Sequence, residues 1–168
     1  MKKFMMAAAV AACFVTTPAM AQGMGLYANG GLTHVDASDM DISFEAVTVR
    51  VGSRFAPNFA VEGEGTFGFE QDRLDGDIYE LNSDFGAYGV VLLPMTENAD
   101  LFARLGWGRT TIEAGGEDVE NDDVRYGVGA QFFFNDASGV RIDFTRYNLA
   151  EDVDGDAYTV SYVQKFGG

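Results

Sequence analysis

The sequence predicts an all-β fold in which eight antiparallel strands, each following the last along the chain, close into an up-and-down transmembrane barrel. Three observations predict it. Runs of alternating apolar and polar residues recur along the chain, short and long connections take turns between the runs, and one parity of the runs carries nearly balanced charge in a strongly acidic chain. Alternate residues of a strand face opposite sides. Each strand is therefore expected to have one apolar and one charged face.

The first 21 residues are predicted to be a secretory signal peptide. Two lysines precede an apolar run at residues 4–15, and Ala19-Met20-Ala21 forms a small-residue cleavage site. The apolar run is too short to span a membrane. Lipoprotein-type processing at Cys13 is the alternative. We expect a signal peptide over residues 1–21 and one barrel domain over residues 22–168.

The composition excludes several classes of function. The net charge of the chain is −15, from 11 Lys+Arg and 26 Asp+Glu, and removal of Lys2 and Lys3 leaves 9 minus 26, or −17. So acidic a chain is a poor partner for nucleic acid. Its one cysteine, Cys13, lies in the predicted signal peptide, so no disulfide is expected. The 21 glycines and the 13% aromatic content favour strands and tight turns over helices.

Eight runs are predicted as strands because one parity of each run is apolar. In chain order, each with part of its apolar set, they are Gly25 to Val35 (Leu26, Ala28, Leu32), Ser43 to Phe55 (Val47, Val49, Val51), Asn58 to Glu70 (Phe59, Val61, Phe67), Tyr79 to Leu93 (Phe85, Ala87, Val91), Leu101 to Ile112 (Leu105, Trp107), the two runs within Asp123 to Tyr147 (Val124, Tyr126, Val128, then Val140, Ile142, Phe144), and Tyr158 to Phe166 (Tyr158, Val160, Tyr162).

The connections alternate in length, which is typical of a meander with one short-turn end and one long-loop end. Short turns are predicted at 56–58, 94–100 and 135–139. Long polar loops, rich in acidic residues, are predicted at 36–41, 71–78, 113–123 and 150–157. If the first short turn pairs Phe55 with Phe59, then Arg50 lies opposite Glu64, and Glu62 is diagonal to both Arg50 and Arg54.

The charged parity favours a membrane barrel over a soluble, ligand-binding barrel of the lipocalin kind, whose apolar parity would point inward. A closed lumen requires balanced charge, because unpaired charges away from water are costly. The predicted luminal ionic network is Arg50, Arg54, Glu62, Glu64, Glu80, Asp84, Arg104, Arg125, Arg141, Asp143 and Lys165.

The segment RYGVGAQFFFNDASGVRIDFTRY, from Arg125 to Tyr147, resembles the penultimate hairpin of small OmpA-type and opacity-type outer-membrane barrels of Gram-negative bacteria. The closing strand up to Phe166 is similar to the C-terminal signal that the barrel-assembly machinery recognises, although Gly167 and Gly168 follow the aromatic residue. The resemblance covers Gly25 to Phe166. It does not extend to the peptidoglycan-binding domain that longer members of the family carry. It implies an outer-membrane location, contact with outer-membrane lipid and lipopolysaccharide, and insertion by the assembly machinery.

Two features could carry chemistry. His34, the one histidine, falls on the apolar parity near the long-loop end, where it could be an interfacial residue or could serve a lipid-A-modifying enzyme; its context, His34-Val35-Asp36, lacks a His-x-Ser spacing. Asp152-Val153-Asp154-Gly155-Asp156 spaces carboxylates as calcium loops do, but its glycine is misplaced and no closing glutamate follows.

The predicted function is that of a monomeric structural or surface-interaction barrel with acidic extracellular loops. The interior of a barrel of about eight strands is filled by the barrel's own side chains. A plugged lumen is therefore favoured over a narrow passive pore. We expect no enzymatic activity, cofactor or dedicated metal site. The alternatives are the enzyme using His34 and the pore.

Overall fold

The computed structural model describes residues 25–37, 42–68, 71–74, 77–114, 117–150 and 153–166. The predicted signal peptide lies outside them. The strands are β1 (Gly25–Ala37), β2 (Ile42–Ala56), β3 (Phe59–Gly68), β4 (Gln71–Leu74), β5 (Asp77–Pro94), β6 (Ala99–Ala114), β7 (Glu117–Phe133), β8 (Ser138–Ala150) and β9 (Val153–Phe166). No helix in the described ranges is long and apolar enough to cross a membrane.

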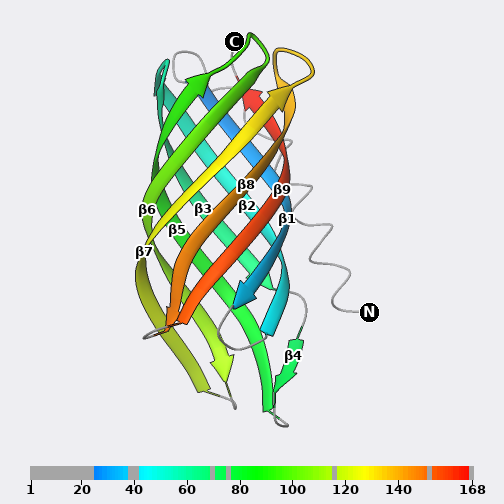
Figure 1. Ribbon diagram of the computed structural model, residues 1–168, viewed down its shortest axis with the longest axis vertical. Helices are drawn as coiled ribbons and strands as arrows, with labels where there is room; N and C mark the ends of the chain where they lie inside the picture. Colours follow the sequence, from blue (N-terminus) through cyan, green and yellow to red (C-terminus); the bar gives the residue numbers. More distant parts are fainter. Residues whose placement is uncertain are drawn as a thin grey trace.

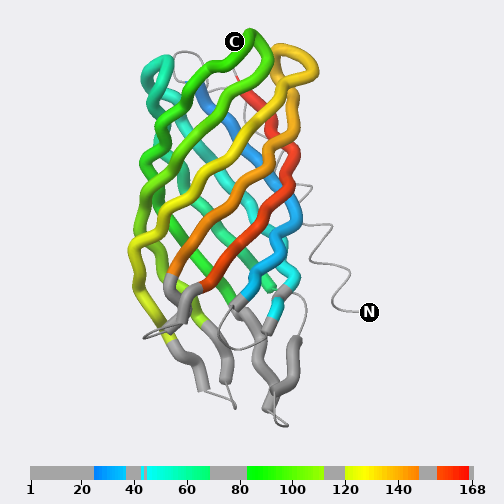
Figure 2. The backbone as a smooth tube through the Cα atoms, in the orientation of Figure 1, coloured from blue at the N-terminus to red at the C-terminus, as the bar shows by residue number. Residues whose placement is uncertain are grey.

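The strands form one closed antiparallel barrel (Figures 1 and 2). β1 pairs with β2 on one side and with β9 on the other, which joins the two ends of the meander. β3 and β4 both pair with β5, so they are two segments of one wall position. The nine segments therefore make eight strands around the barrel, and the predicted fold class is confirmed.

The first short turn contains a β-bulge that the sequence did not reveal. Arg50 pairs with Glu64 as predicted, but the register shifts between Arg54 and Ala56, and Phe59 pairs with Ala56 instead of Phe55. Two residues of β2 thus oppose one of β3, the definition of a bulge. The Phe55 and Phe59 rings still stack, with centroids 6.4 Å apart and planes 18° from parallel.

Much of the predicted long loops is strand. β6 runs to Ala114 and β7 begins at Glu117, inside the loop predicted at 113–123, and β4 lies inside the loop predicted at 71–78. Cross-strand ion pairs explain part of the difference, because opposite charges facing each other stabilise a sheet of otherwise poor strand formers. The Arg109 guanidinium lies 2.7 Å from Asp122 and 3.5 Å from Glu120.

One side of the barrel wall continues beyond the rest as a four-stranded sheet. β7 pairs with β8 only from Tyr126 to Phe133, and β2 pairs with β3 no farther than Ala46 and Gly68. Past these points β4, β5, β6 and β7 still pair with one another. We call this sheet the outer extension: β4 with residues 77–83, 109–114 and 117–125. It lies at the lower end of Figure 1.

The two faces of the wall differ sharply in chemistry. Large apolar side chains on the outward face are about half exposed or more; they include Leu32 at 61%, Leu105 at 62%, Val128 at 58% and Val160 at 63%. The inward face buries charged and hydroxyl side chains, among them Arg50, Arg125, Arg141 and Thr48, each at 1% exposure. The apolar belt faces the membrane and the charges face the lumen.

Candidate functional site

The centre of the lumen holds a layer of three arginines and three carboxylates, which we call the central layer: Arg50, Arg104, Arg141, Glu62, Glu64 and Asp143. Their side chains are at most 6% exposed. Arg50 donates to both carboxylate oxygens of Asp143, at 2.9 Å each, and also to Glu64. Arg141 donates to both oxygens of Glu62, at 2.5 and 3.1 Å. The charges of the layer sum to zero.

Further donors and aromatic rings complete the central layer. The Tyr27 hydroxyl donates to Glu62 at 2.6 Å and the Tyr88 hydroxyl to Glu64 at 3.1 Å. The Arg104 guanidinium lies 4.3 Å from the centre of the Tyr88 ring, and that of Arg141 lies 3.9 Å from the Phe102 ring. Buried ion pairs are tolerated when hydrogen bonds satisfy their remaining groups, and cation–π contacts add to this.

A second charged layer lies toward the long-loop end. Arg125 donates to Asp84 at 2.8 Å, to Asp123 at 2.8 Å and to the Thr110 hydroxyl at 2.9 Å. Its guanidinium also lies 5.0 Å from the centre of the Tyr147 ring. One arginine between two carboxylates gives this layer one net negative charge.

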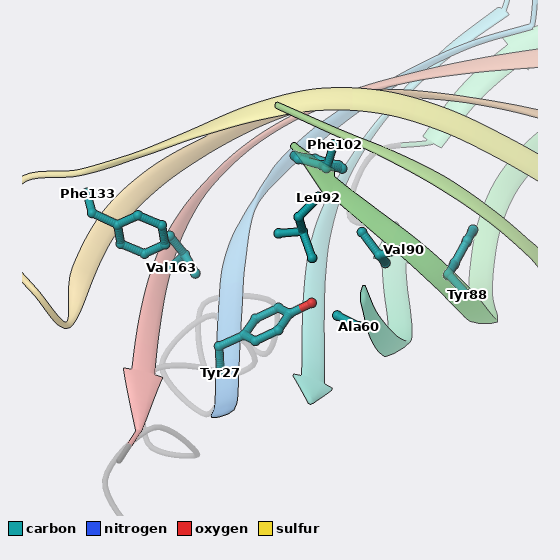
Figure 3. Close-up of a cluster of buried hydrophobic side chains, with 8 residues drawn as sticks. All are labelled: Tyr27, Ala60, Tyr88, Val90, Leu92, Phe102, Phe133 and Val163. Carbon is teal, nitrogen blue, oxygen red and sulfur yellow. The ribbon is translucent and has the colours of Figure 1, made fainter. Parts of the chain in front are cut away.

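The short-turn end of the lumen contains an apolar cluster (Figure 3). Three of its members lie on β5 and the others come one each from β1, β3, β6, β7 and β9; together they are Tyr27, Ala60, Tyr88, Val90, Leu92, Phe102, Phe133 and Val163. Next to it the Lys165 ammonium lies 3.4 Å from the centre of the Phe133 ring. Gln131 donates to Asp100 at 2.8 Å, and Arg54 lies 3.5 Å from the same carboxylate. The lumen is therefore ionic in the middle, while at this end an apolar cluster lies beside a few polar groups.

Between the two charged layers lies a cavity of about 20 Å³. Both charged layers contribute to its lining, together with five threonines: Thr33, Thr48, Thr66, Thr145 and Thr159. Thr33 hydrogen-bonds Thr48 at 2.6 Å and Thr159 at 2.9 Å, and Thr48 bonds Thr66 at 2.8 Å. The cavity is large enough for a water molecule and is polar enough to hold one.

Comparison with known proteins identifies the barrel. Residues 5–166 match the model of the outer membrane protein beta-barrel domain family. The chain belongs to this family. It is an outer-membrane protein, and the family resemblance and the location expected from the sequence are confirmed. No curated protein matches the chain significantly.

Solved structures share the fold of this outer-membrane barrel. Ail, the attachment invasion locus protein of Yersinia pestis, in complex with the heparin analogue sucrose octasulfate, is 12% identical with a TM-score of 0.61, over 85% of this chain and 97% of that one. Neisserial surface protein A is 16% identical with a TM-score of 0.56, over 86% and 98%. The N-terminal barrel domain of Pseudomonas aeruginosa OprF is 7% identical with a TM-score of 0.61, over 85% and 99%. At these identities the likeness shows the fold alone.

The outer-membrane barrel brings eight of the predicted luminal residues into its two charged layers: Arg50, Glu62, Glu64, Asp84, Arg104, Arg125, Arg141 and Asp143. Arg54 and Lys165 lie at the short-turn end, where Arg54 donates to the Pro57 carbonyl at 3.0 Å. The side chain of Glu80 is not among those described.

Glu62 pairs with Gly52 and so lies diagonal to Arg50 and Arg54, as predicted. Its hydrogen bonds nevertheless come from Tyr27 on β1 and Arg141 on β8. In a barrel of this size inward side chains meet across the lumen, so partners come from strands that are not adjacent. Sequence reasoning also missed Asp100 and Asp123, which it assigned to a turn and a loop, although the parity of Asp123 matches that of Arg125.

The two motifs singled out for chemistry lie away from the lumen or outside the description. His34 points outward and its Nδ1 lies 2.8 Å from Glu45, with side chains 46% and 40% exposed. The Asp152 motif falls partly outside the described residues, and Asp156 accepts two hydrogen bonds from Arg146, at 2.7 and 2.8 Å. Within the described ranges, no three His, Cys, Asp or Glu side chains gather as a metal site would require.

Proposed function

We propose that this outer-membrane barrel is a non-conducting, non-enzymatic surface protein whose lumen is plugged and whose acidic end faces the exterior. The observation that carries the proposal is the central layer. Its three arginines and three carboxylates are buried, hydrogen-bonded to one another and balanced in charge. Opening a path through it would leave buried charges without partners, which is costly.

The apolar cluster supports the plug from the short-turn side. Leu92, Phe102 and Val163 are at most 3% exposed, and they contribute no polar side-chain atoms that could replace the hydration of an ion. An ion would have to pass both this cluster and the central layer. A narrow passive pore is therefore the weaker interpretation of the lumen.

The outward face supports the proposed orientation. At the long-loop end the apolar belt stops at the hydrogen-bonded pair of His34 with Glu45 and at two ion pairs, Arg109 with Asp122 and Arg146 with Asp156. At the other end Phe55, Phe59 and Phe134 are exposed beside short turns. Aromatic girdles border the apolar band of outer-membrane barrels, whose short turns face the periplasm and whose long loops face outward. The outer extension would then stand outside the cell.

The charge of the exterior end guides the choice of partners. At this end the arginines with described side chains on the outward face, Arg109 and Arg146, are each paired with a carboxylate. An acidic exterior repels polyanions, so we do not propose for this chain a sulfated ligand like the one bound to Ail. We propose outer-membrane lipid and lipopolysaccharide around the apolar belt, the barrel-assembly machinery during insertion, and a monomeric state.

The absence of enzymatic activity is part of the proposal. The pair formed by His34 and Glu45 is the observation that favours the alternative, a lipid-A-modifying enzyme, because a carboxylate orients a histidine in many catalytic sites. We expect lipid A from cells producing the wild-type protein and from cells producing His34→Ala to give the same mass spectrum as lipid A from cells without the protein. A modification present with wild type and lost in His34→Ala would establish the enzyme.

Planar-bilayer recording tests the plug. We expect no unitary conductance from the purified wild-type barrel. The variant Glu64→Ala/Arg104→Ala removes one cation and one anion of the central layer, with the ion pairs that they make, and keeps the layer neutral. It shows what a loosened central layer conducts. Reproducible conductance steps from the wild-type barrel that scale with the amount of inserted protein would contradict the plugged lumen and establish a pore.

A further inference from the structure

The cavity between the two charged layers is lined mainly by groups that can donate hydrogen bonds. Three arginines contribute to the lining: Arg50, Arg104 and Arg125. Two carboxylates do so as well, those of Glu64 and Asp84, and hydroxyl side chains make up most of the remainder. The lining residues therefore carry one net positive charge, three from arginine minus two from the carboxylates.

Four of the lining threonines form a chain of hydrogen bonds that leaves one hydroxyl proton unused. Thr33 bonds Thr48 at 2.6 Å and Thr159 at 2.9 Å, and Thr48 bonds Thr66 at 2.8 Å. Each hydroxyl has one proton to donate. Three bonds among four hydroxyls therefore use three protons, whichever way the bonds run. The fourth proton finds no acceptor in the hydrogen bonds of the described residues.

Two more hydroxyl groups of the lining have protons to donate. Thr145 accepts two hydrogen bonds from the Arg104 guanidinium, at 3.0 and 2.5 Å. These bonds occupy both lone pairs of the Thr145 oxygen, so its proton needs an acceptor elsewhere. Tyr147 is 7% exposed, and its hydroxyl makes no hydrogen bond to the residues that the structure describes. Buried donors without acceptors are costly, so the cavity calls for an occupant that accepts.

The occupant that fits the lining is an anion. In the described hydrogen bonds the carboxylate of Glu64 accepts from two arginines and a tyrosine, and that of Asp84 from an arginine and a threonine. A water molecule accepts two hydrogen bonds but brings two protons of its own, whereas a halide ion only accepts. The volume of about 20 Å³ exceeds the roughly 10–15 Å³ that one water molecule needs, which leaves room for the slightly larger chloride ion.

We propose that the cavity between the charged layers binds a single chloride ion, held by the hydroxyl groups of Tyr147, Thr145 and the threonine chain beside the three guanidinium groups. Hydrogen bonds to a charged acceptor are stronger than those between neutral groups. Carboxylates behind the lining pair with Arg50 and Arg125, so the donated protons and not the net charge hold the ion. We therefore expect a dissociation constant of roughly millimolar order. The inference goes beyond the proposed function, because it needs neither an orientation in the membrane nor a partner protein.

The first test measures the stability of the folded mature protein in vesicles of a zwitterionic lipid as chloride replaces gluconate at constant ionic strength. An ion that binds only the folded state raises the free energy of unfolding once its concentration passes the dissociation constant. The urea midpoint should therefore rise with chloride. Tyr147→Phe removes one donor and keeps the ring against Arg125, and it should weaken the apparent chloride affinity about tenfold. Tyr126→Phe, the matched control, removes an exposed hydroxyl on the outward face and should respond to chloride like wild type.

The second test needs no variant. Crystals of the wild-type protein grown with sodium bromide should give an anomalous difference peak inside the cavity, within hydrogen-bond distance of the Tyr147 hydroxyl. A water molecule there without a bromide signal, a urea midpoint that ignores chloride, or a Tyr147→Phe variant that responds like wild type would each overturn the inference. A bromide peak without chloride-dependent stability would mean binding at crystal concentration only, and would overturn it too. Failure here leaves the plugged barrel intact, because its conductance and the lipid A mass do not depend on the occupant of the cavity.

Discussion

Several inward glycines lie under the flat side chains that fill the lumen. A Cβ atom added to Gly52 would lie 2.4 Å from the Tyr27 ring, and one added to Gly108 would lie 2.3 Å from the Arg125 guanidinium. A Cβ added to Gly129 would lie 2.4 Å from the Phe102 ring. The missing side chains let aromatic rings and guanidinium groups lie flat against the wall, which is how a narrow barrel accommodates large residues.

Gly106→Ala should destabilise the barrel by about 1–3 kcal/mol, the usual cost of overpacking a tight core. Its new Cβ would lie 2.2 Å from the Ala87 carbonyl oxygen and 2.5 Å from the Tyr88 ring. Gly63→Ala is the matched control, because nothing lies within 4 Å of its added Cβ. Urea unfolding from lipid vesicles, followed by the fluorescence of the single tryptophan, measures both. Equal free energies of unfolding for the two variants would show that the residues around Gly106 can move to make room for the added methyl group.

The pair formed by Arg141 and Glu62 should show strong coupling. Arg141→Met leaves the Glu62 carboxylate buried with Tyr27 as its remaining close donor, and removal of one partner of a buried pair costs about 3–5 kcal/mol. The double variant Arg141→Met/Glu62→Met should recover much of that loss, because neither charge is then left alone. A double-mutant cycle of unfolding free energies checks this. Additive losses would mean that the two side chains act independently.

At the scale of strands, the alternation of apolar residues predicted the strands that lie at the level of the membrane. The membrane-level runs, such as Val47 to Val51, have the period of two that a half-buried strand requires. Beyond the membrane that signal ends. Residues 117–123 carry one apolar side chain, Val119, so they read as a loop. Their strand state depends on pairing with β6, which no local pattern reveals.

The stability of the hairpin formed by β6 and β7 should depend on pH through the Asp122 carboxyl. The hydrogen bond from Arg109, together with its charge, holds the pKa of this carboxyl below its usual range. The folded carboxyl therefore binds protons less readily than the unfolded one. The stabilisation is present above the ordinary pKa of aspartate and is lost as the pH falls through the lower, folded value.

Carboxyl ¹³C NMR should thus show Asp122 titrating below the ordinary range of an aspartate. In Arg109→Gln the pKa of Asp122 should rise toward the ordinary value. An unchanged Asp122 titration in this variant would mean that the ion pair does not form in solution.

At the scale of the whole molecule, closure of the barrel determines which luminal side chains meet, and a list of strands does not give these contacts. The sequence placed most of the charged residues on one parity, and that parity faces the lumen. It could not supply their pairing, because Arg50 reaches Asp143 from β2 to β8, across 93 positions of the chain. The apolar cluster was also unforeseen: Leu92, Phe102 and Val163 occupy the parity expected to be polar, and they are buried because that parity faces the closed lumen.

The position of the barrel in the membrane can be tested with its own tryptophan. Trp107 is the only one in the chain, its side chain faces outward, and the residue is 51% exposed. Two positions farther along the same face of β6 lies Arg109, whose ion pair with Asp122 marks the end of the apolar belt. A tryptophan so placed should sit near the outer boundary of the hydrocarbon, as aromatic girdle residues do.

Lipids brominated at known carbons should therefore quench Trp107 most strongly when the bromines are near the head group, and less when they are near the bilayer centre. Trp107→Phe/Phe102→Trp moves the fluorophore to the lumen, where Phe102 is 3% exposed, and should remove quenching by every brominated lipid. Acrylamide in the buffer should reach neither position efficiently. Strong acrylamide quenching of Trp107 with none from brominated lipid would place the apolar face in water. Strongest quenching from the bilayer centre would move the membrane boundary past Arg109 and into the outer extension.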